Sequence, residues 1–166
     1  MLQPTVRRTW APRGQTPIHY SWDRRDRLSC ISAVTVSPSR RRLGLYFEVL
    51  DHNVRTDDFE AFVAWLLRRL GRSITLVMDR LQAHRSAARR LKAMFGRRVV
   101  IEWLPAYAPD LNPDEQVWQR AKYVELANFI PEDVDELEAA LDGAMERTGS
   151  QLSLLRSFFD HAGLPL

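Results

Sequence analysis

The stretch SITLVMDRLQAHRSAARRLKAMFGRRVVIEWLP, residues 73–105, decides the fold. Residues 73–79 and 97–104 are short apolar runs between polar boundaries, which is typical of strands buried on both faces. Between the two runs, residues 84–95 are predicted to form a helix that Gly96 closes. The order strand, helix, strand predicts a right-handed parallel βαβ unit.

Three further strands are predicted before this unit. Residues 18–22, 27–37 and 43–51 are rich in strand-forming residues and are separated by charged turns, which indicates an antiparallel meander. A helix should follow, with Thr56 as its N-cap and Gly71 at its end, because one apolar stripe at helical spacing runs between them.

More helices are expected after the unit, at about 113–127, 131–147 and 151–161. The whole order predicts an α/β fold with a mixed five-stranded sheet, in which three antiparallel strands precede two parallel ones and helices pack on the faces. The length of 166 residues fits one domain with a sizeable core. Since no repeat or linker divides the chain, residues 1–166 are expected to form a single domain.

Composition excludes several classes of protein. No apolar run approaches the roughly 20 residues that a membrane-spanning helix needs. The N-terminal stretch MLQPTVRRTWAPRG lacks the apolar segment of a signal peptide. Cys30 is the single cysteine, which excludes an internal disulfide framework and a cysteine-based zinc site. These features favour a reducing, cytoplasmic setting.

The charges of the chain are unevenly spread. The formal net charge is +3, but residues 1–100 hold 20 Lys and Arg against 8 Asp and Glu, whereas residues 101–166 hold 4 against 13. Nearly all the basic residues are arginines, which bind phosphate bidentately and stack on bases. A basic half therefore suits nucleic acid. Charge alone leaves open the alternative of a solvated surface whose arginines reflect genomic base composition.

The first candidate for chemistry is Asp79, which ends an apolar strand. Ligands of open α/β sheets bind beyond the carboxyl ends of parallel strands. A carboxylate at the end of such a run needs solvent, hydrogen bonds or a cation. The alternative interpretation is that Asp79 caps the following turn through Arg80 and Leu81.

The second candidate lies in WLPAYAPDLNPDEQVWQRAKY, residues 103–123. Asn112 suits an N-cap, Pro113 the first helical position and Glu115 the third, so a capping box accounts for Glu115. The same position also suits a carboxylate that binds a divalent metal ion beside Asp79. Both interpretations stay open at this point.

Two side chains follow Glu115 on the same side of the predicted helix. Trp118 lies three positions later and is expected in the core, while Lys122 lies seven positions later and could reach a phosphate. Two-metal phosphoryl transfer generally uses ions about 3.5–4 Å apart, for which we expect at least three carboxylates. The sequence offers two strong candidates, so a third is still needed.

The stretches LVMDRLQAHRS (76–86) and WLPAYAPDLNPDEQVWQRAKY (103–123) resemble the catalytic domain of DDE transposases, in the bacterial insertion-sequence branch related to mariner elements. That family's pattern is an apolar strand ending in Asp, a nearby His, a second strand, and then a Leu-Pro-x-Tyr-x-Pro-x-Leu-Asn-Pro-x-Glu loop before a helix with Trp and Lys. RRTWAPRGQTP (7–17) and the strands up to residue 50 also resemble the family. The resemblance implies an RNase H-like fold, in agreement with the predicted order of elements.

The resemblance also implies a site and a reaction. Asp79 matches the second acidic ligand and Glu115 the third, for Mg²⁺ or Mn²⁺, with two ions in the intact family site. His84 matches a position near the active site, and Asn112 and Pro113 match the loop that sets the glutamate. The implied reaction is cleavage and transfer of DNA strands, by attack of water or a DNA 3′-hydroxyl on a phosphodiester.

The implied partners are double-stranded DNA at transposon ends and either further copies of this chain or a full-length transposase. The implied location is the bacterial cytoplasm, at the nucleoid. The family's first Asp usually precedes a segment that starts here at Arg7, whereas nothing acidic precedes Asp23. Asp23 and Asp26 are expected in a turn and are poor substitutes. We therefore expect this chain to begin after the first catalytic Asp, without the family's helix-turn-helix region, and to be weakly active or inactive alone.

Two classes of function thus remain open. In the first, the chain is a metal-dependent enzyme that cuts and joins DNA through Asp79 and Glu115. In the second, it is a non-catalytic DNA-binding module, or an assembly module that pairs with a full-length transposase and inhibits it. In either class the residues expected to bind DNA are Arg40, Arg41, Arg42, Arg89, Arg90 and Lys122.

Overall fold

The computed structural model describes residues 7–15, 18 and 28–166 of the chain. Strands β1 (Ser29–Val36) and β2 (Leu43–Leu50) form an antiparallel hairpin in which Ser29 pairs with Leu50 and Val36 with Leu43. These strands confirm two members of the predicted meander. The strand expected at 18–22 lies outside the described residues, apart from its first position.

Helix α1 (Thr56–Leu70) follows the hairpin and begins with a cap that differs from the prediction. Arg55 is the N-cap residue, and its backbone N–H donates a 2.7 Å hydrogen bond to Asp58 Oδ2. The prediction of Thr56 as N-cap is therefore wrong by one residue. Asp58, three positions after the cap, supplies the oxygen that fixes the start of the helix.

Glycines end both of the helices for which a glycine stop is predicted. Gly71 follows α1 in the left-handed conformation, with φ 64°, and its N–H bonds to Leu67 O at 3.1 Å. Gly96 follows α2 (Gln82–Phe95) with φ 54°. Only glycine adopts positive φ without a steric penalty from a Cβ atom, so these two ends are set by the sequence.

Strands β3 (Ile74–Met78) and β4 (Val99–Trp103) flank α2 and pair in parallel, as predicted. The prediction that both strands are buried on both faces is wrong for the described residues. Val77 is 56% exposed and Val100 is 46% exposed, because helices α1 and α2 pack on one face of this pair only.

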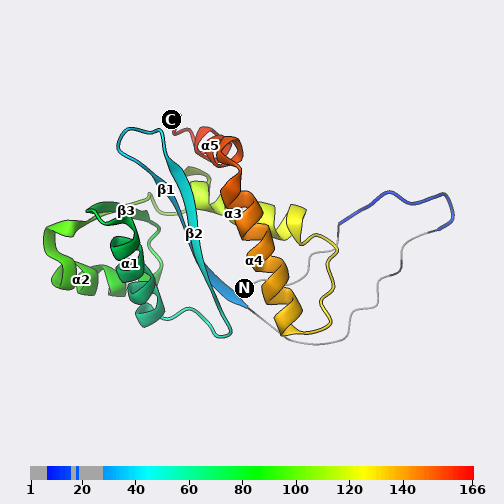
Figure 1. Ribbon diagram of the computed structural model, residues 1–166, viewed down its shortest axis with the longest axis horizontal. Helices are drawn as coiled ribbons and strands as arrows, with labels where there is room; N and C mark the ends of the chain where they lie inside the picture. The colour runs from blue at the N-terminus through cyan, green and yellow to red at the C-terminus, as the bar shows by residue number, and fades with distance from the viewer. Residues whose placement is uncertain (1–6, 16–17, 19–27) are drawn as a thin grey trace.

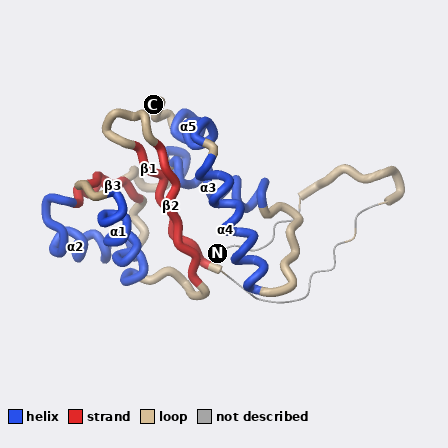
Figure 2. Tube along the Cα trace, in the orientation of Figure 1, coloured by secondary structure: helices blue, strands red, loops and turns tan. Residues whose placement is uncertain are grey.

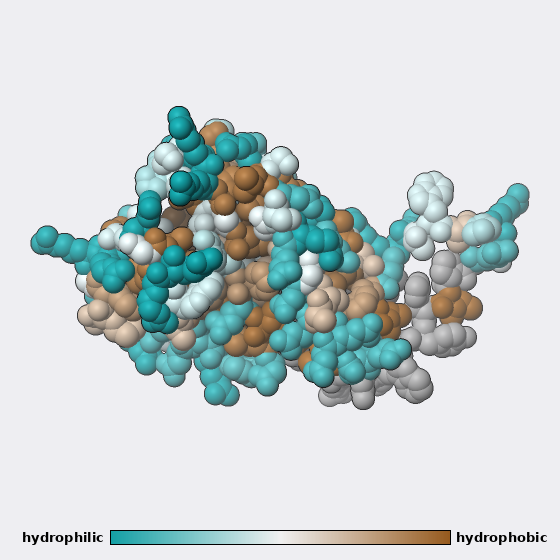
Figure 3. Space-filling view, in the orientation of Figure 1, coloured by the Kyte–Doolittle hydropathy of each residue, from teal (hydrophilic) through white to brown (hydrophobic). Residues whose placement is uncertain are grey.

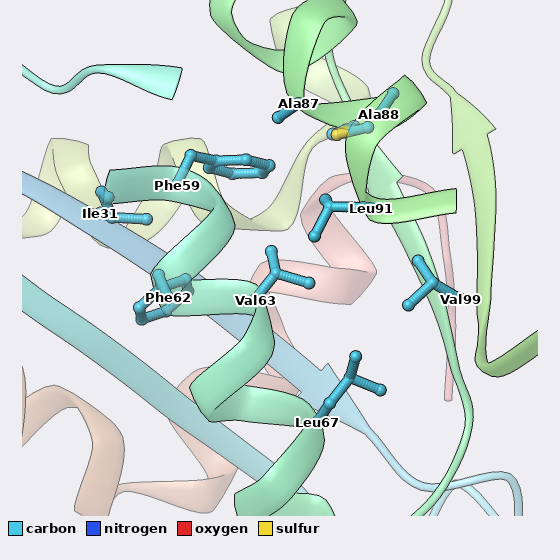
Figure 4. Close-up of a cluster of buried hydrophobic side chains, with 10 residues drawn as sticks. Ile31, Phe59, Phe62, Val63, Leu67, Ala87, Ala88, Leu91 and Val99 are labelled. Atoms are coloured by element: carbon cyan, nitrogen blue, oxygen red, sulfur yellow. The ribbon is translucent and has the colours of Figure 1, made fainter. Parts of the chain in front are cut away.

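The β1–β2 hairpin lies between two groups of helices (Figures 1 and 2). Ile31 and Ala33 of β1 face the first core, which Figure 4 shows and which is built from α1, α2, β3 and β4. Cys30 and Val34 face the second core, because successive side chains of a strand point to opposite faces. Buried residues of the first core are Ile31, Phe59, Phe62, Val63, Leu67, Met78, Ala87, Ala88, Leu91 and Val99.

The second core lies among the C-terminal helices. Helix α3 (Pro113–Arg120) continues into a π-helical turn (Ala121–Glu125), and α4 (Val134–Ser150) and α5 (Leu152–His161) follow, close to the predicted ranges. Their buried side chains pack against β1 and β2, and burial raises the pKa of the Cys30 thiol to about 12. Buried residues of this core are Val117, Ala121, Leu126, Leu141, Met145, Leu155 and Phe158.

The described residues therefore form two separate two-stranded sheets, β1–β2 and β3–β4, with helices around them. The mixed α/β character and the parallel βαβ unit agree with the prediction, whereas a single five-stranded sheet is not present within residues 28–166. No helix in the described part of the chain is both long and apolar enough to cross a bilayer.

Candidate active site

Asp79 directly follows β3, at the carboxyl end of the parallel pair. Its Oδ1 atom accepts a 3.0 Å hydrogen bond from the Leu81 N–H and lies 2.6 Å from Nδ1 of His84. The predicted turn-capping role of Asp79 is thus real. Both of these contacts use the same oxygen, and the side chain is 43% exposed, so Oδ2 keeps lone pairs that face solvent or a ligand.

His84 in the first turn of α2 is held between two elements. Its ring packs on the Phe59 ring of α1, with centroids 4.5 Å apart, and its Nδ1 contacts Asp79. A proton on Nδ1 would be donated to the carboxylate, which leaves Nε2 as an acceptor. The imidazole therefore orients the Asp79 carboxyl group, in the way that outer partners orient metal-binding side chains.

The loop before α3 fixes Glu115, although not through the predicted capping box. Asn112 is the N-cap, its Oδ1 accepts from the Asp114 N–H at 3.2 Å, and Pro113 takes the first helical position. The Asn112 N–H, which a capping-box glutamate would bond, donates instead to Pro109 O at 2.9 Å. The Glu115 carboxylate is therefore not engaged at the helix start.

Asp114 was not recognised from the sequence, and it attaches α3 to β1. Its Oδ2 accepts hydrogen bonds from Ser32 Oγ at 2.7 Å and from Trp118 Nε1 at 3.1 Å. Its Oδ1 is buried without a partner among the described residues. Burial raises the pKa of Asp114 to about 6, against the two hydrogen bonds, and the charge of Glu115 raises it further. The one local signal for this contact was the spacing of Asp114 and Trp118 by four residues.

Strand β1 packs against the residue that precedes Glu115 and helps to form the core that holds the residue preceding Asp79. Ser32 bonds Asp114, the residue before Glu115, on one side of the strand. Its neighbour Ile31 points to the other side, into the core that also contains Met78, the residue before Asp79. Asp114 and Met78 thus lie on opposite sides of β1, Asp114 through its bond to Ser32 and Met78 in the core that it shares with Ile31.

The predicted DNA-binding residues are spread over separate elements. Arg40, Arg41 and Arg42 are exposed in the turn between β1 and β2, and Arg89 is exposed on α2. Lys122 lies in the π-helical turn after α3. The structure does not bring these side chains together into one cluster.

Arg90 forms ion pairs with two carboxylates of helix α1. Its guanidinium group lies 3.0 Å from an oxygen of Asp57 and 3.1 Å from an oxygen of Glu60, both on α1. These ion pairs hold α2 against α1. The charge of Arg90 is thereby compensated by the protein itself.

The donor chemistry of the site suits a hard divalent cation. Mg²⁺ and Mn²⁺ bind carboxylate oxygens, which Asp79 and Glu115 supply. Within residues 28–166 and the short described N-terminal segment, no three His, Cys, Asp or Glu side chains gather in a way that could hold a metal ion. Asp79 and Glu115 are thus carboxylates of the kind that such an ion binds, and a site built on them would need a further ligand.

Comparison with solved structures defines the class of fold. The chain is similar to a chain in the crystal structure of the Mos1 strand transfer complex, with a TM-score of 0.56 and 16% sequence identity. The match covers 98% of this chain and 50% of the other, so this chain spans about half the length of that relative. At this identity the likeness establishes the fold, a mixed α/β arrangement shared with Mos1.

The family follows from the sequence model that matches residues 1–138, described as DDE superfamily endonuclease. This chain belongs to the DDE superfamily endonucleases, which confirms the resemblance drawn from the motifs around Asp79 and Glu115. A search of curated proteins finds no match to the sequence.

Proposed function

We propose that this chain is the catalytic domain of a transposase-type enzyme that cleaves and transfers DNA strands, with Asp79 and Glu115 as ligands of a divalent cation. The observation that carries the proposal is the availability of both carboxylates. The bonds of Asp79 to Leu81 and His84 both use Oδ1, so Oδ2 is available. At the start of α3, the hydrogen bonds are made by Asn112 and Pro109 rather than by the Glu115 carboxylate. Family membership supplies the reaction class.

Each side chain around the site would contribute a distinct task. His84 orients Asp79, and the Asn112–Pro113 cap fixes the position from which Glu115 extends. When bound, a divalent cation supplies Lewis-acid activation of the attacking oxygen and charge stabilisation at the leaving oxygen. Arg40, Arg41, Arg42, Arg89 and Lys122 would bind phosphates of the substrate, since basic side chains neutralise phosphate charge.

A third carboxylate and the five-stranded sheet belong to the same proposal. Within the described residues, β1 pairs only with β2 and β3 pairs only with β4. Residues of β1 and β3 nevertheless pack in one core. A further strand placed between β1 and β3 would join the pairs into the RNase H-like sheet, and in the intact family site that strand carries the first acidic ligand. Without that carboxylate, catalysis by this chain alone would be impaired.

The test is nicking of duplex DNA that carries the ends of the element, with Mg²⁺ or Mn²⁺ and with EDTA. Cleavage should require the metal ion, because two carboxylates alone provide no electrophile for the phosphodiester. Asp79→Asn and Glu115→Gln should each reduce it to background. Glu138→Gln and Asp160→Asn, which alter exposed carboxylates on α4 and α5, should leave it unchanged. Activity that survives both site substitutions contradicts the proposal.

The second candidate function is a DNA-binding or assembly module without cleavage, acting with a full-length transposase or another copy of the chain. It is favoured by one observation, namely that the described carboxylates do not gather into a group of three. In this case duplex DNA binds with strong salt dependence while no metal-dependent nicking occurs. Addition of a full-length transposase distinguishes the two candidates, since an assembly module would inhibit its activity.

A further inference from the structure

Helix α2 carries a row of basic side chains on its solvent-exposed side. Arg85, Arg89 and Lys92 are exposed and lie at positions i, i+4 and i+7, which places them along one side of the helix. The helix contains no Asp or Glu. Within the described residues no ion pair involves any of these three side chains. The row therefore presents uncompensated positive charge to solvent.

Arg90 lies on the same helix, but its positive charge is compensated by neighbouring carboxylates. It follows Arg89 by one residue, so its side chain points about 100° further around the helix axis. There it meets Asp57 and Glu60 of α1. Helix α2 thus separates its basic residues into one that binds α1 and a row that faces away from those carboxylates.

The row lies on the helix whose first turn contacts Asp79 through His84. Arg85 directly follows His84, which contacts Asp79 at 2.6 Å, and Lys92 lies about 10 Å further along the helix axis. Helix α2 forms one end of the described molecule, and hydrophilic side chains project from that end in the space-filling view (Figures 1 and 3). The row therefore runs from the end of α2 that lies beside Asp79 towards the opposite end of the helix.

We infer that Arg85, Arg89 and Lys92 form a phosphate-binding row that holds the backbone of duplex DNA as it leaves the Asp79 site. The inference rests on the proposed function, because it takes the DNA that Asp79 would act on as its ligand. The chemistry favours a polyanion with regularly spaced charges. Each of the three side chains can bind a phosphate of such a polyanion, and arginine binds phosphate oxygens bidentately.

The experiment measures how the affinity for duplex DNA depends on salt, in EDTA so that no cleavage occurs. A fluorescent duplex of about 30 base pairs is titrated at several salt concentrations. Each phosphate contact contributes about 0.9 to the slope of log Kobs against log salt. The triple variant Arg85→Gln, Arg89→Gln, Lys92→Gln should therefore reduce the slope by about 2.7.

A matched control removes the same charge elsewhere. Arg68, Arg69 and Arg72 are exposed around the last turn of α1, whereas α2 contacts the first turn of that helix through Asp57, Phe59 and Glu60. Their replacement by glutamine should change the slope by less than about one unit. The double variant Arg85→Gln, Arg89→Gln should lower the slope by about 1.8 and serves if the triple variant does not fold.

The outcomes separate this inference from the proposed function. Equal slopes for the row variant and the α1 control overturn the row, while metal-dependent nicking that requires Asp79 would still support the enzyme. Competition by poly-glutamate as strong as that by DNA also overturns it, since the row would then fit any acidic polymer. Absence of duplex binding by the unmodified chain at low salt contradicts both proposals.

Discussion

At the scale of single residues, Asp114 is the side chain near the site whose burial most destabilises the folded protein. One of its oxygens is buried without a partner in the described part of the chain, and a buried carboxylate resists ionisation. Its other oxygen bonds Ser32 and Trp118 and so holds the first turn of α3 on β1. The burial of Asp114 lowers the stability of the fold, and its hydrogen bonds fix the position of the neighbouring Glu115.

This arrangement predicts a specific pH dependence of stability. The pKa of Asp114 is raised from 3.8 to about 6 in the folded protein, so the folded state binds more protons than the unfolded state between these values. The free energy of unfolding should therefore fall as pH rises through this window, by about 3 kcal/mol for this group. Asp114→Asn should remove that slope and be the more stable form at pH 7.5, with an advantage that disappears towards pH 4.

Urea unfolding from pH 4 to 7.5 measures the effect. Asp110→Asn is the matched control, since Asp110 is exposed and its replacement should leave the slope in place. A constant difference in the free energy of unfolding between Asp114→Asn and the unmodified chain across this range would show that the carboxyl group does not titrate as proposed.

The sequence predicted only part of the site, and the division has a physical cause. The position of Asp79 at a strand end and the Asn112 cap follow from local pattern, whereas His84 was singled out by the family resemblance alone. The role of Asp114 does not, because its partner Ser32 lies 82 residues away and meets it only in the folded chain. Local pattern also assigned Glu115 to a capping box, whereas Pro109 O takes the required N–H.

At the scale of secondary-structure elements, glycine has opposite effects at a helix end and in a helix interior. Gly71 ends α1 with φ 64°, a backbone conformation that is strained for any residue with a Cβ atom. A Cβ added there would have no neighbouring atom within 4 Å, so the strain lies in the backbone conformation and not in a clash. Gly71→Ala should therefore destabilise the protein by about 1 kcal/mol. The same change at Gly143, inside α4, should be neutral or stabilising by up to about 1 kcal/mol, since alanine is the better helix former.

Thermal and urea unfolding of the two alanine variants provide the measurement. At Gly143 the added Cβ would come 3.0 Å from the end of the flexible Arg147 side chain, which can move aside. Gly71→Asn is the control for conformation, because asparagine tolerates positive φ better than alanine and should recover part of the loss. Equal effects of alanine at both positions would contradict the argument.

The burial of β3 and β4 shows what an apolar pattern leaves undetermined. Runs of apolar residues predicted the two strands and their parallel pairing correctly. They did not reveal that Val77 and Val100 remain exposed, because burial depends on which helices cover each face. In the described residues, the C-terminal helices pack on β1 and β2 instead. Local sequence predicts which residues form a strand, whereas the packing of the whole chain decides which helices cover each face of a sheet.

At the scale of the whole molecule, the proposal of a five-stranded sheet makes a prediction about hydrogen exchange. Strand β1 has β2 on one side only in the described residues. If a further strand pairs with its other side, the amides of β1 that do not face β2 should be protected as strongly as those that do. Backbone amides bonded within a sheet core open only through large unfolding events, so the expected exchange is slow.

Exchange measured residue by residue by NMR provides the check. The amides of β2 that face away from β1 serve as the internal reference, because in the described structure that side of β2 has no strand partner. Protection of the β1 edge no greater than that of the β2 edge would contradict a five-stranded sheet and leave two separate pairs.

The position of Cys30 provides a chemical reporter of unfolding. The side chain packs between β1 and the C-terminal helices, with a pKa of about 12, so the reactive thiolate is scarce near neutral pH. Because this cysteine is alone in the chain, an alkylating reagent has one target. Iodoacetamide should modify the native protein very slowly, and its rate of reaction should follow the opening of the second core. The rate of covalent labelling thus reports how often the C-terminal helices separate from the β1–β2 hairpin.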